Sequence, residues 1–104
     1  MNIEDPEDEL DRIKELARDN AFSYTHEAFR LMVERSLYEE DVKRAFSTSR
    51  LDGLLEDPRG RVLFALSGFG MNEDTLLLLC RMSRNKVLVL DVDRAPDIDA
   101  GADA

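Results

Sequence analysis

The chain has 104 residues, of which 14 are Lys or Arg and 23 are Asp or Glu, so its formal net charge is −9. This length supports a single domain with one modest core, and the negative charge argues against a general binder of nucleic acid or of membrane surfaces. The single Cys cannot form an internal disulfide, and the charged residues 1–20 exclude a signal peptide, so we expect a cytoplasmic protein with no membrane span.

Residues 1–24 predict one helix and a short connection. Asp5 can cap the helix with its carboxylate, and Pro6 stands at the first helical position, where its missing N–H costs nothing. Apolar residues then recur at helical spacing as far as Asn20, where the helix is expected to end, and residues 21–24 are expected to be a linker. The expected buried stripe consists of Leu10, Ile13, Leu16 and Ala17.

Residues 25–48 predict two further helices. Thr25 can cap a helix that runs to about Arg35, and Glu39 begins another. The second of these is expected to end at residues 47–49, because short hydroxyl side chains compete for backbone hydrogen bonds. Their apolar spacing predicts one buried side for each helix, with Ala28, Phe29, Met32 and Val33 in the first and Val42, Ala45 and Phe46 in the second.

The rest of the chain predicts strands. A short irregular strand is expected over residues 51–55, and longer strands are expected over residues 62–66, 75–82 and 86–92. Turn signals such as Asp-Pro-Arg-Gly at 57–60 separate them, and short turns between consecutive strands favour antiparallel neighbours. The Leu-rich run could instead be a buried helix, but the turns that bracket it favour a strand.

These elements predict an α+β fold, in which two or three N-terminal helices pack on a three- to four-stranded antiparallel meander. Residues 1–96 form a single domain in this prediction. Residues 97–104 contain three Asp and no basic residue, and they are expected to form a disordered acidic tail.

The predicted strands are apolar on both faces. A sheet with one wet face should alternate apolar and polar residues, but the runs at 62–66, 76–80 and 87–90 do not. Helices of the predicted lengths can cover one face, so the other is expected to pack on a protein partner or on a second copy of the chain; the alternative is that helices cover both faces. The expected interface residues are Leu63, Ala65, Leu77, Leu79, Leu88 and Leu90.

No residue pattern in the chain predicts a metal site or a bound cofactor. His26 is the only His; near a helix N-terminus it could act as a general acid or base, although a surface or capping role is commoner. Arg81, Arg84 and Arg61 lie near predicted turns, where they could hold phosphates or form a solvated rim that balances the acidic helices. Cys80 lies in the Leu-rich run and is expected to be buried and inert.

Several short motifs, in this order and spacing, resemble a small bacterial and archaeal family of unknown function. They are YTHEA at residues 24–28, MVER at 32–35, EEDV at 39–42 and DPRG at 57–60, followed by three strands. That family is thought to be related to the RelE/ParE-like toxins. The resemblance therefore implies helices on a twisted antiparallel sheet, together with either ribonuclease activity or antitoxin binding. For a ribonuclease it implies that the three arginines hold the scissile phosphate and that His26 transfers protons.

Three functional hypotheses follow from the sequence. The favoured one is a RelE-like protein without enzymatic activity that acts through protein–protein contact at its apolar sheet face. The first alternative is a toxin-like ribonuclease of a toxin–antitoxin pair. The second is a nucleic-acid mimic, because an acidic helical surface can occupy a basic groove on another protein.

Overall fold

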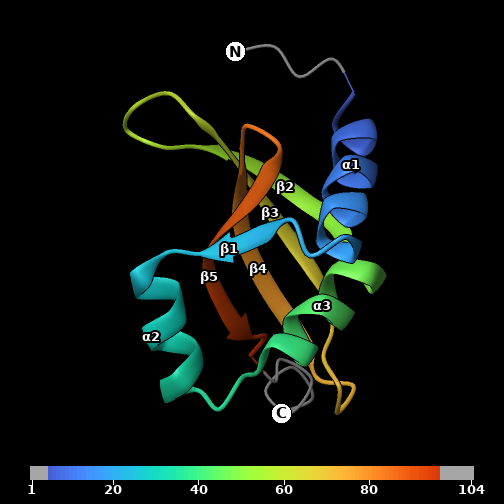
Figure 1. The fold of residues 1–104 in the computed structure, drawn as a ribbon, viewed down its shortest axis with the longest axis vertical. Coiled ribbons are helices and arrows are strands. Elements are labelled where there is room, and N and C mark those ends of the chain that lie inside the picture. Colours follow the sequence, from blue (N-terminus) through green and yellow to red (C-terminus); the bar gives the residue numbers. More distant parts are fainter. Residues whose placement is uncertain (1–4, 97–104) are drawn as a thin grey trace, which may run out of the picture.

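The computed structural model describes residues 5–96, which form three helices and five strands (Figure 1). The helices are α1 (Pro6–Arg18), α2 (His26–Glu34) and α3 (Glu39–Thr48). The strands are β1 (Phe22–Tyr24), β2 (Arg50–Glu56), β3 (Val62–Phe69), β4 (Thr75–Ser83) and β5 (Lys86–Arg94). The predicted α+β class is confirmed, whereas the predicted acidic tail lies outside the described residues.

Side-chain caps fix where the helices begin. Asp5 Oδ1 accepts a hydrogen bond from the N–H two residues further on at 3.0 Å, and Thr25 Oγ1 accepts one from the Ala28 N–H at 3.0 Å, as predicted. At the start of α3, Asp41 Oδ2 accepts the backbone N–H of Tyr38 at 3.0 Å. These bonds satisfy amide groups that have no partner inside the helix, so each helix starts at a defined residue.

The strands form one sheet in the order β1-β5-β4-β3-β2. From β2 to β5 each strand pairs antiparallel with the next, as expected for strands joined by short turns. The prediction of a linker at residues 21–24 is wrong, because β1 forms there and pairs in parallel with β5. Three residues are too few to show an alternating pattern, so this strand has no signal in the sequence. The sheet is therefore mixed and has five strands.

All three helices pack on the same face of the sheet, which is the front face in Figure 1. α3 lies against β3 and β4, α2 lies beside β1 and β5, and α1 packs on α3 and reaches β2 and β5. The helices bring Leu10, Ile13, Ala17, Ala28, Met32, Val42, Ala45 and Phe46 into the core. The strands bring Phe64, Leu66, Leu76, Leu78, Cys80, Val87, Val89 and Val92, all from one face of the sheet.

α2 buries a narrower side than the sequence predicts. Ala28 and Met32 are buried, but Phe29 and Val33 are 57 % and 65 % exposed, so their prediction as core residues is wrong. The reason is the position of α2 beside the short β1, at the margin of the sheet, where only part of its apolar surface meets the core.

β3 is longer than predicted and continues through Gly68 to Phe69. At Gly68 the strand passes close to α3: a Cβ atom there would lie 2.0 Å from the carbonyl oxygen of Ala45. Gly68 therefore lies where β3 packs closely against α3, and β3 does not end there. No helix within residues 5–96 is long and apolar enough to cross a membrane.

Candidate interaction surface

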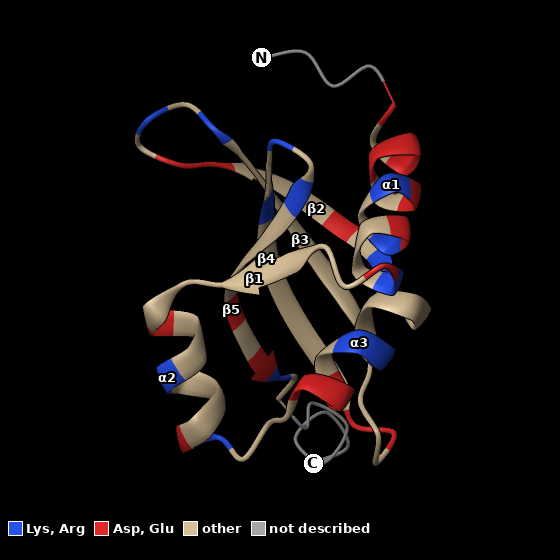
Figure 2. Ribbon diagram, viewed as in Figure 1, with Lys and Arg blue, Asp and Glu red and all other residues tan. Residues whose placement is uncertain are grey.

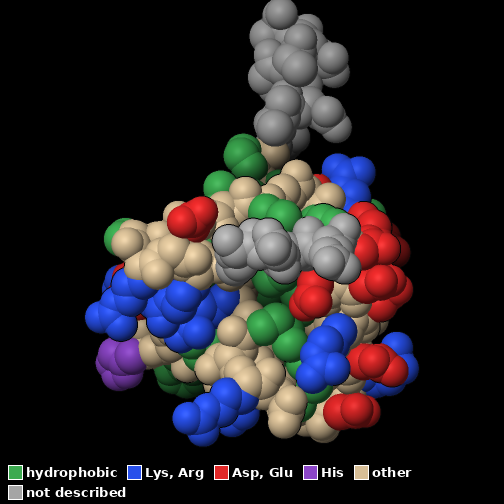
Figure 3. All heavy atoms as spheres, turned by 90° about the horizontal axis from the view of Figure 1, so that it is seen from above, with side chains coloured by type: hydrophobic (Ala, Val, Ile, Leu, Met, Phe, Trp, Pro, Cys, Tyr) green, Lys and Arg blue, Asp and Glu red, His purple; other side chains and the backbone are tan. Residues whose placement is uncertain are grey.

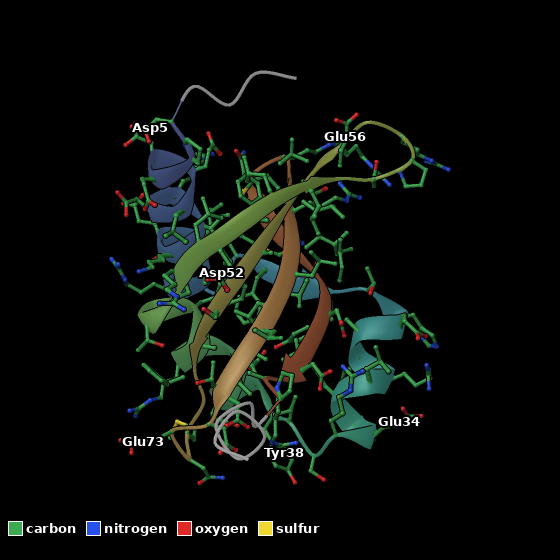
Figure 4. The ribbon with its side chains drawn as sticks, turned by 180° about the vertical axis from the view of Figure 1, so that it is seen from behind. Asp5, Glu34, Tyr38, Asp52, Glu56 and Glu73 are labelled. Carbon is green, nitrogen blue, oxygen red and sulfur yellow. The ribbon has the colours of Figure 1, made fainter. Side chains whose placement is uncertain are left out.

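The face of the sheet turned away from the helices, which we call the open face, is seen from behind the molecule in Figure 4, and none of the three helices crosses it. Strand register arranges its side chains in three rows across the strands. The row nearest the β4–β5 turn, called the hairpin-end row, contains Ser23, Leu88, Arg81, Leu63 and Leu55. The central row contains Asp91, Leu79, Ala65 and Gly53. The far row, at the other end of the strands, contains Asp93, Leu77, Ser67 and Arg50.

The predicted interface residues meet on this face. Five of the six belong to the three rows, and Leu90 is the extra residue of the bulge in β5 beside Leu79. Leu77 is 40 % exposed and Leu55 is 53 % exposed, whereas the others are partly shielded by neighbours on adjacent strands. Within residues 5–96 all three helices pack on one face of the sheet, and none of them crosses the other face.

A basic side chain stands in the leucine-rich part of the open face. Arg81 is partly buried between Leu88 and Leu63, and it forms no ion pair or side-chain hydrogen bond with any residue from 5 to 96. Lys86 lies on the same face at the end of the β4–β5 hairpin and is likewise unpaired within the described chain. An unpaired, partly desolvated guanidinium is a group that a carboxylate of a partner can satisfy.

The opposite end of the open face is acidic. Asp91 and Asp93 lie in the central and far rows, and Arg35 at the end of α2 bridges them at 2.9 Å and 3.6 Å. One guanidinium serves two carboxylates there, so this corner keeps a surplus negative charge. On its β4–β5 side the open face is thus positive at the hairpin end and negative at the other end, with leucines between, whereas Arg50 lies in the far row on β2.

The outer edge of β5 is protected beyond the end of β1. Arg35 Nη1 donates to the carbonyl oxygen of Val92 at 2.6 Å, and Arg94 Nη1 donates to the carbonyl oxygen of Arg35 at 2.6 Å. At the other edge of the sheet, a bulge at Asp52 interrupts the register of β2. Both features hinder strand addition at the edges and leave the open face as the larger available surface.

The residues predicted for ribonuclease chemistry come from different elements of the fold. Arg81 is on the open face, Arg84 is in the β4–β5 turn, and Arg61 precedes β3 and pairs with Asp57 at 2.7 Å. His26 is the exposed first residue of α2 and does not belong to the sheet. Figure 3, which looks onto the end of the molecule that carries the hairpin turns, shows Lys and Arg side chains in several separate groups.

A basic groove between α1 and α3 was not predicted from the sequence. It has a volume of about 490 Å³, and its apolar lining residues are Ala17, Phe46 and Met71. The cations at its sides are Lys14, Arg18, Lys43 and Arg44, and Figure 2 shows the basic turns of the two helices close together. The spacing of Lys14 and Arg18, four residues apart on one helix, was the available signal.

A second hollow of about 480 Å³ lies between α2 and the start of α3. Exposed Phe29 and Val33 line it, together with Tyr24, whose hydroxyl is buried and has no hydrogen-bond partner among the described residues. Burial, together with the nearby carboxylates of Glu39 and Glu40, raises the pKa of Tyr24 above its ordinary value, so the phenol stays protonated.

Cys80 is fully buried in the core, as predicted, and its burial raises the pKa of the thiol to about 12. A thiol that stays protonated is a poor nucleophile, so the residue acts as a small apolar side chain. Within residues 5–96 no three His, Cys, Asp or Glu side chains are grouped so that they could hold a metal ion.

Comparisons of the chain with protein-family models, with curated proteins and with solved structures gave no match.

Proposed function

We propose that this protein acts through protein–protein contact, as a RelE-like module without enzymatic activity, and that its open face is the contact surface. The observation that carries the proposal is the arrangement of the sheet: all helices lie on one face, and the other face is rich in leucine. Contiguous apolar surface of this kind usually marks an interface.

The energetic argument concerns partly exposed leucines. Complete burial of a leucine side chain stabilises a complex by about 1.5–3 kcal/mol, and the open face carries Leu55, Leu63, Leu77, Leu79 and Leu88 with part of their surface still in water. Arg81 adds a directional contact at the centre of the hairpin-end row, and arginine is enriched among the residues that dominate binding energies. A partner that covers this face gains apolar burial and a charge pair together.

The test is photo-crosslinking in the cells that produce the protein. A photoreactive phenylalanine analogue replaces Leu77 on the open face, and in a matched control it replaces Glu15, which is exposed on α1. We expect a discrete adduct larger than 11.9 kDa from position 77 and none from position 15. No adduct from position 77, or equal adducts from both positions, overturns the proposal.

A toxin-like ribonuclease is the second candidate, and the observation that favours it is the unpaired Arg81 with Lys86 on the same face. Two cations can hold a phosphate, but the proton-transfer group proposed for this chemistry, His26, belongs to α2 and not to the sheet. Cleavage of RNA by the purified protein that is lost with Arg81→Ala would support it. The nucleic-acid mimic has less support, because the basic groove between α1 and α3 interrupts the acidic helical surface.

A further inference from the structure

We propose that the partner at the open face is a second copy of this chain. The two copies stack face to face around a two-fold axis that runs across the strands, so that Arg81 of each copy meets the acidic corner of Asp91 and Asp93 of the other. This inference rests on the proposed function and names the occupant of the same surface.

The order of charges along the strands makes the open face complementary to itself. Arg81 and Leu77 lie on β4 on either side of Leu79, and Asp93 pairs with Leu77 across the β4–β5 ladder. A two-fold axis that crosses the strands beneath Leu79 reverses the strand direction. The hairpin-end row of one copy then lies over the far row of the other, and the central row lies over itself. The two Asp91 side chains therefore face each other, and the Arg35 that pairs with each of them at 2.9 Å offsets their repulsion. Each Arg81 therefore faces the mate's Leu77 and reaches the Asp93 beside it, and this contact occurs twice.

The other in-plane axis does not give this match. A two-fold axis parallel to the strands and beneath β4 keeps each row over itself, so Arg81 lies over Arg81 and the acidic corners remain unpaired. Like charges placed opposite each other oppose association. The charge pattern thus selects the antiparallel stacking, in which the two sheets lie about 10 Å apart with their strands within about 30° of each other.

The size of the face fits a reversible dimer. The strands β2 to β5 have 7, 8, 9 and 9 residues. With about 3.3 Å per residue and about 4.8 Å between strands, the face measures about 520 Å². Two copies would bury about 1,050 Å², which lies just below the usual range of specific interfaces and suits a weak, reversible dimer.

The net charge of −9 per copy opposes association, but the arrangement limits this effect. The acidic first turns belong to α1 and α3, on the far side of the sheet from the proposed contact. At physiological salt, exposed charges further apart than about 8 Å are largely screened. The charges on the open face therefore contribute most of the electrostatic energy of association.

Sedimentation velocity over a micromolar concentration series tests the proposal, with Arg81→Asp and Asp93→Arg as the informative variants. We expect the wild-type protein to approach twice its 11.9 kDa mass as concentration rises. Each variant alone places like charges together at both contacts and should weaken the dimer at least about tenfold. Mixing the two variants should restore dimers, because a heterodimer contains an opposite-charge pair at both contacts.

Recovery on mixing separates a direct contact from a folding defect, since two misfolded chains do not restore each other. Arg44→Asp is the matched control, because it makes the same charge change on the exposed side of α3 and should leave the dimer intact. A monomer at all concentrations, or variants that do not recover on mixing, overturns the second-copy proposal. If the adduct from position 77 is then another protein, the proposed function stands without self-association; if there is no adduct, both fail.

Discussion

Gly68→Ala should destabilise the fold strongly through a single added methyl group. The new Cβ would lie 2.0 Å from the carbonyl oxygen and 2.8 Å from the carbonyl carbon of Ala45 in α3, whereas real Cβ atoms do not approach such atoms within 3.0 Å. Strand and helix must therefore separate by about 1 Å, which disturbs packing around fully buried Phe46. We expect a loss of about 3 kcal/mol in the free energy of unfolding, at the upper end for overpacked cores.

The matched control is Gly53→Ala. Gly53 lies in β2, and a Cβ there would meet no atom within 4 Å. The control should leave stability unchanged or raise it by up to about 1 kcal/mol, because Ala restricts the unfolded chain more than Gly does. Urea denaturation measures both free energies, and thermal unfolding should show a melting temperature roughly 12–24 °C lower for Gly68→Ala. If Gly68→Ala proves as stable as Gly53→Ala, the close contact between β3 and α3 does not exist in solution.

Three further predictions concern groups that hold the layers together. Asp41→Ala should lower the free energy of unfolding in urea by about 2 kcal/mol, because Asp41 accepts hydrogen bonds from the N–H groups of Tyr38 and Met71 at 3.0 Å and 2.9 Å. A loss within about 0.5 kcal/mol, the usual range for substitutions on a protein surface, would contradict this. Arg35→Ala should cost about 2 kcal/mol and speed amide exchange in the second half of β5, whereas the exposed Arg30→Ala control should cost less. Because the pKa of Cys80 is higher in the folded chain, ionisation of the thiol favours unfolding, so stability should fall between about pH 8.5 and the folded pKa of about 12. Cys80→Ala should remove that part of the pH dependence, and the native thiol should resist alkylation at pH 8 until the chain is denatured.

The sequence predicted the elements that carry strong local signals. Asp5 before Pro6 and Thr25 before α2 mark helix starts because a side-chain oxygen must satisfy the first free amides, and these hydrogen bonds form. The turn at residues 57–60 also formed as predicted, with the Gly60 N–H donating to the Asp57 carbonyl at 2.9 Å. Such signals act over four residues and depend little on the rest of the fold.

The features that the sequence did not reveal depend on contacts between distant segments. β1 exists because Phe22 and Tyr24 pair with Val87 and Val89, more than sixty positions later, and no local pattern encodes that. Phe29 has the spacing of a core residue, but it is exposed because α2 lies at the margin of the sheet. Amphipathic spacing predicts that a helix has an apolar side, and the tertiary fold decides how much of that side is covered.

The open face shows how much a pattern can predict before the fold is known. Absence of alternation in β4 and β5 predicted that both faces would be apolar, and Leu77, Leu79 and Leu88 do lie on the face opposite the helices. The position of Asp93 on the same face as Arg81 follows only from the bulge in β5, which shifts the register by one residue. Without that bulge, Asp93 and Asp91 would turn toward the helices, into an apolar core where a carboxylate is costly to bury. The bulge therefore keeps the acidic corner on the same face as Arg81, and the charge order that makes the face complementary to itself depends on it.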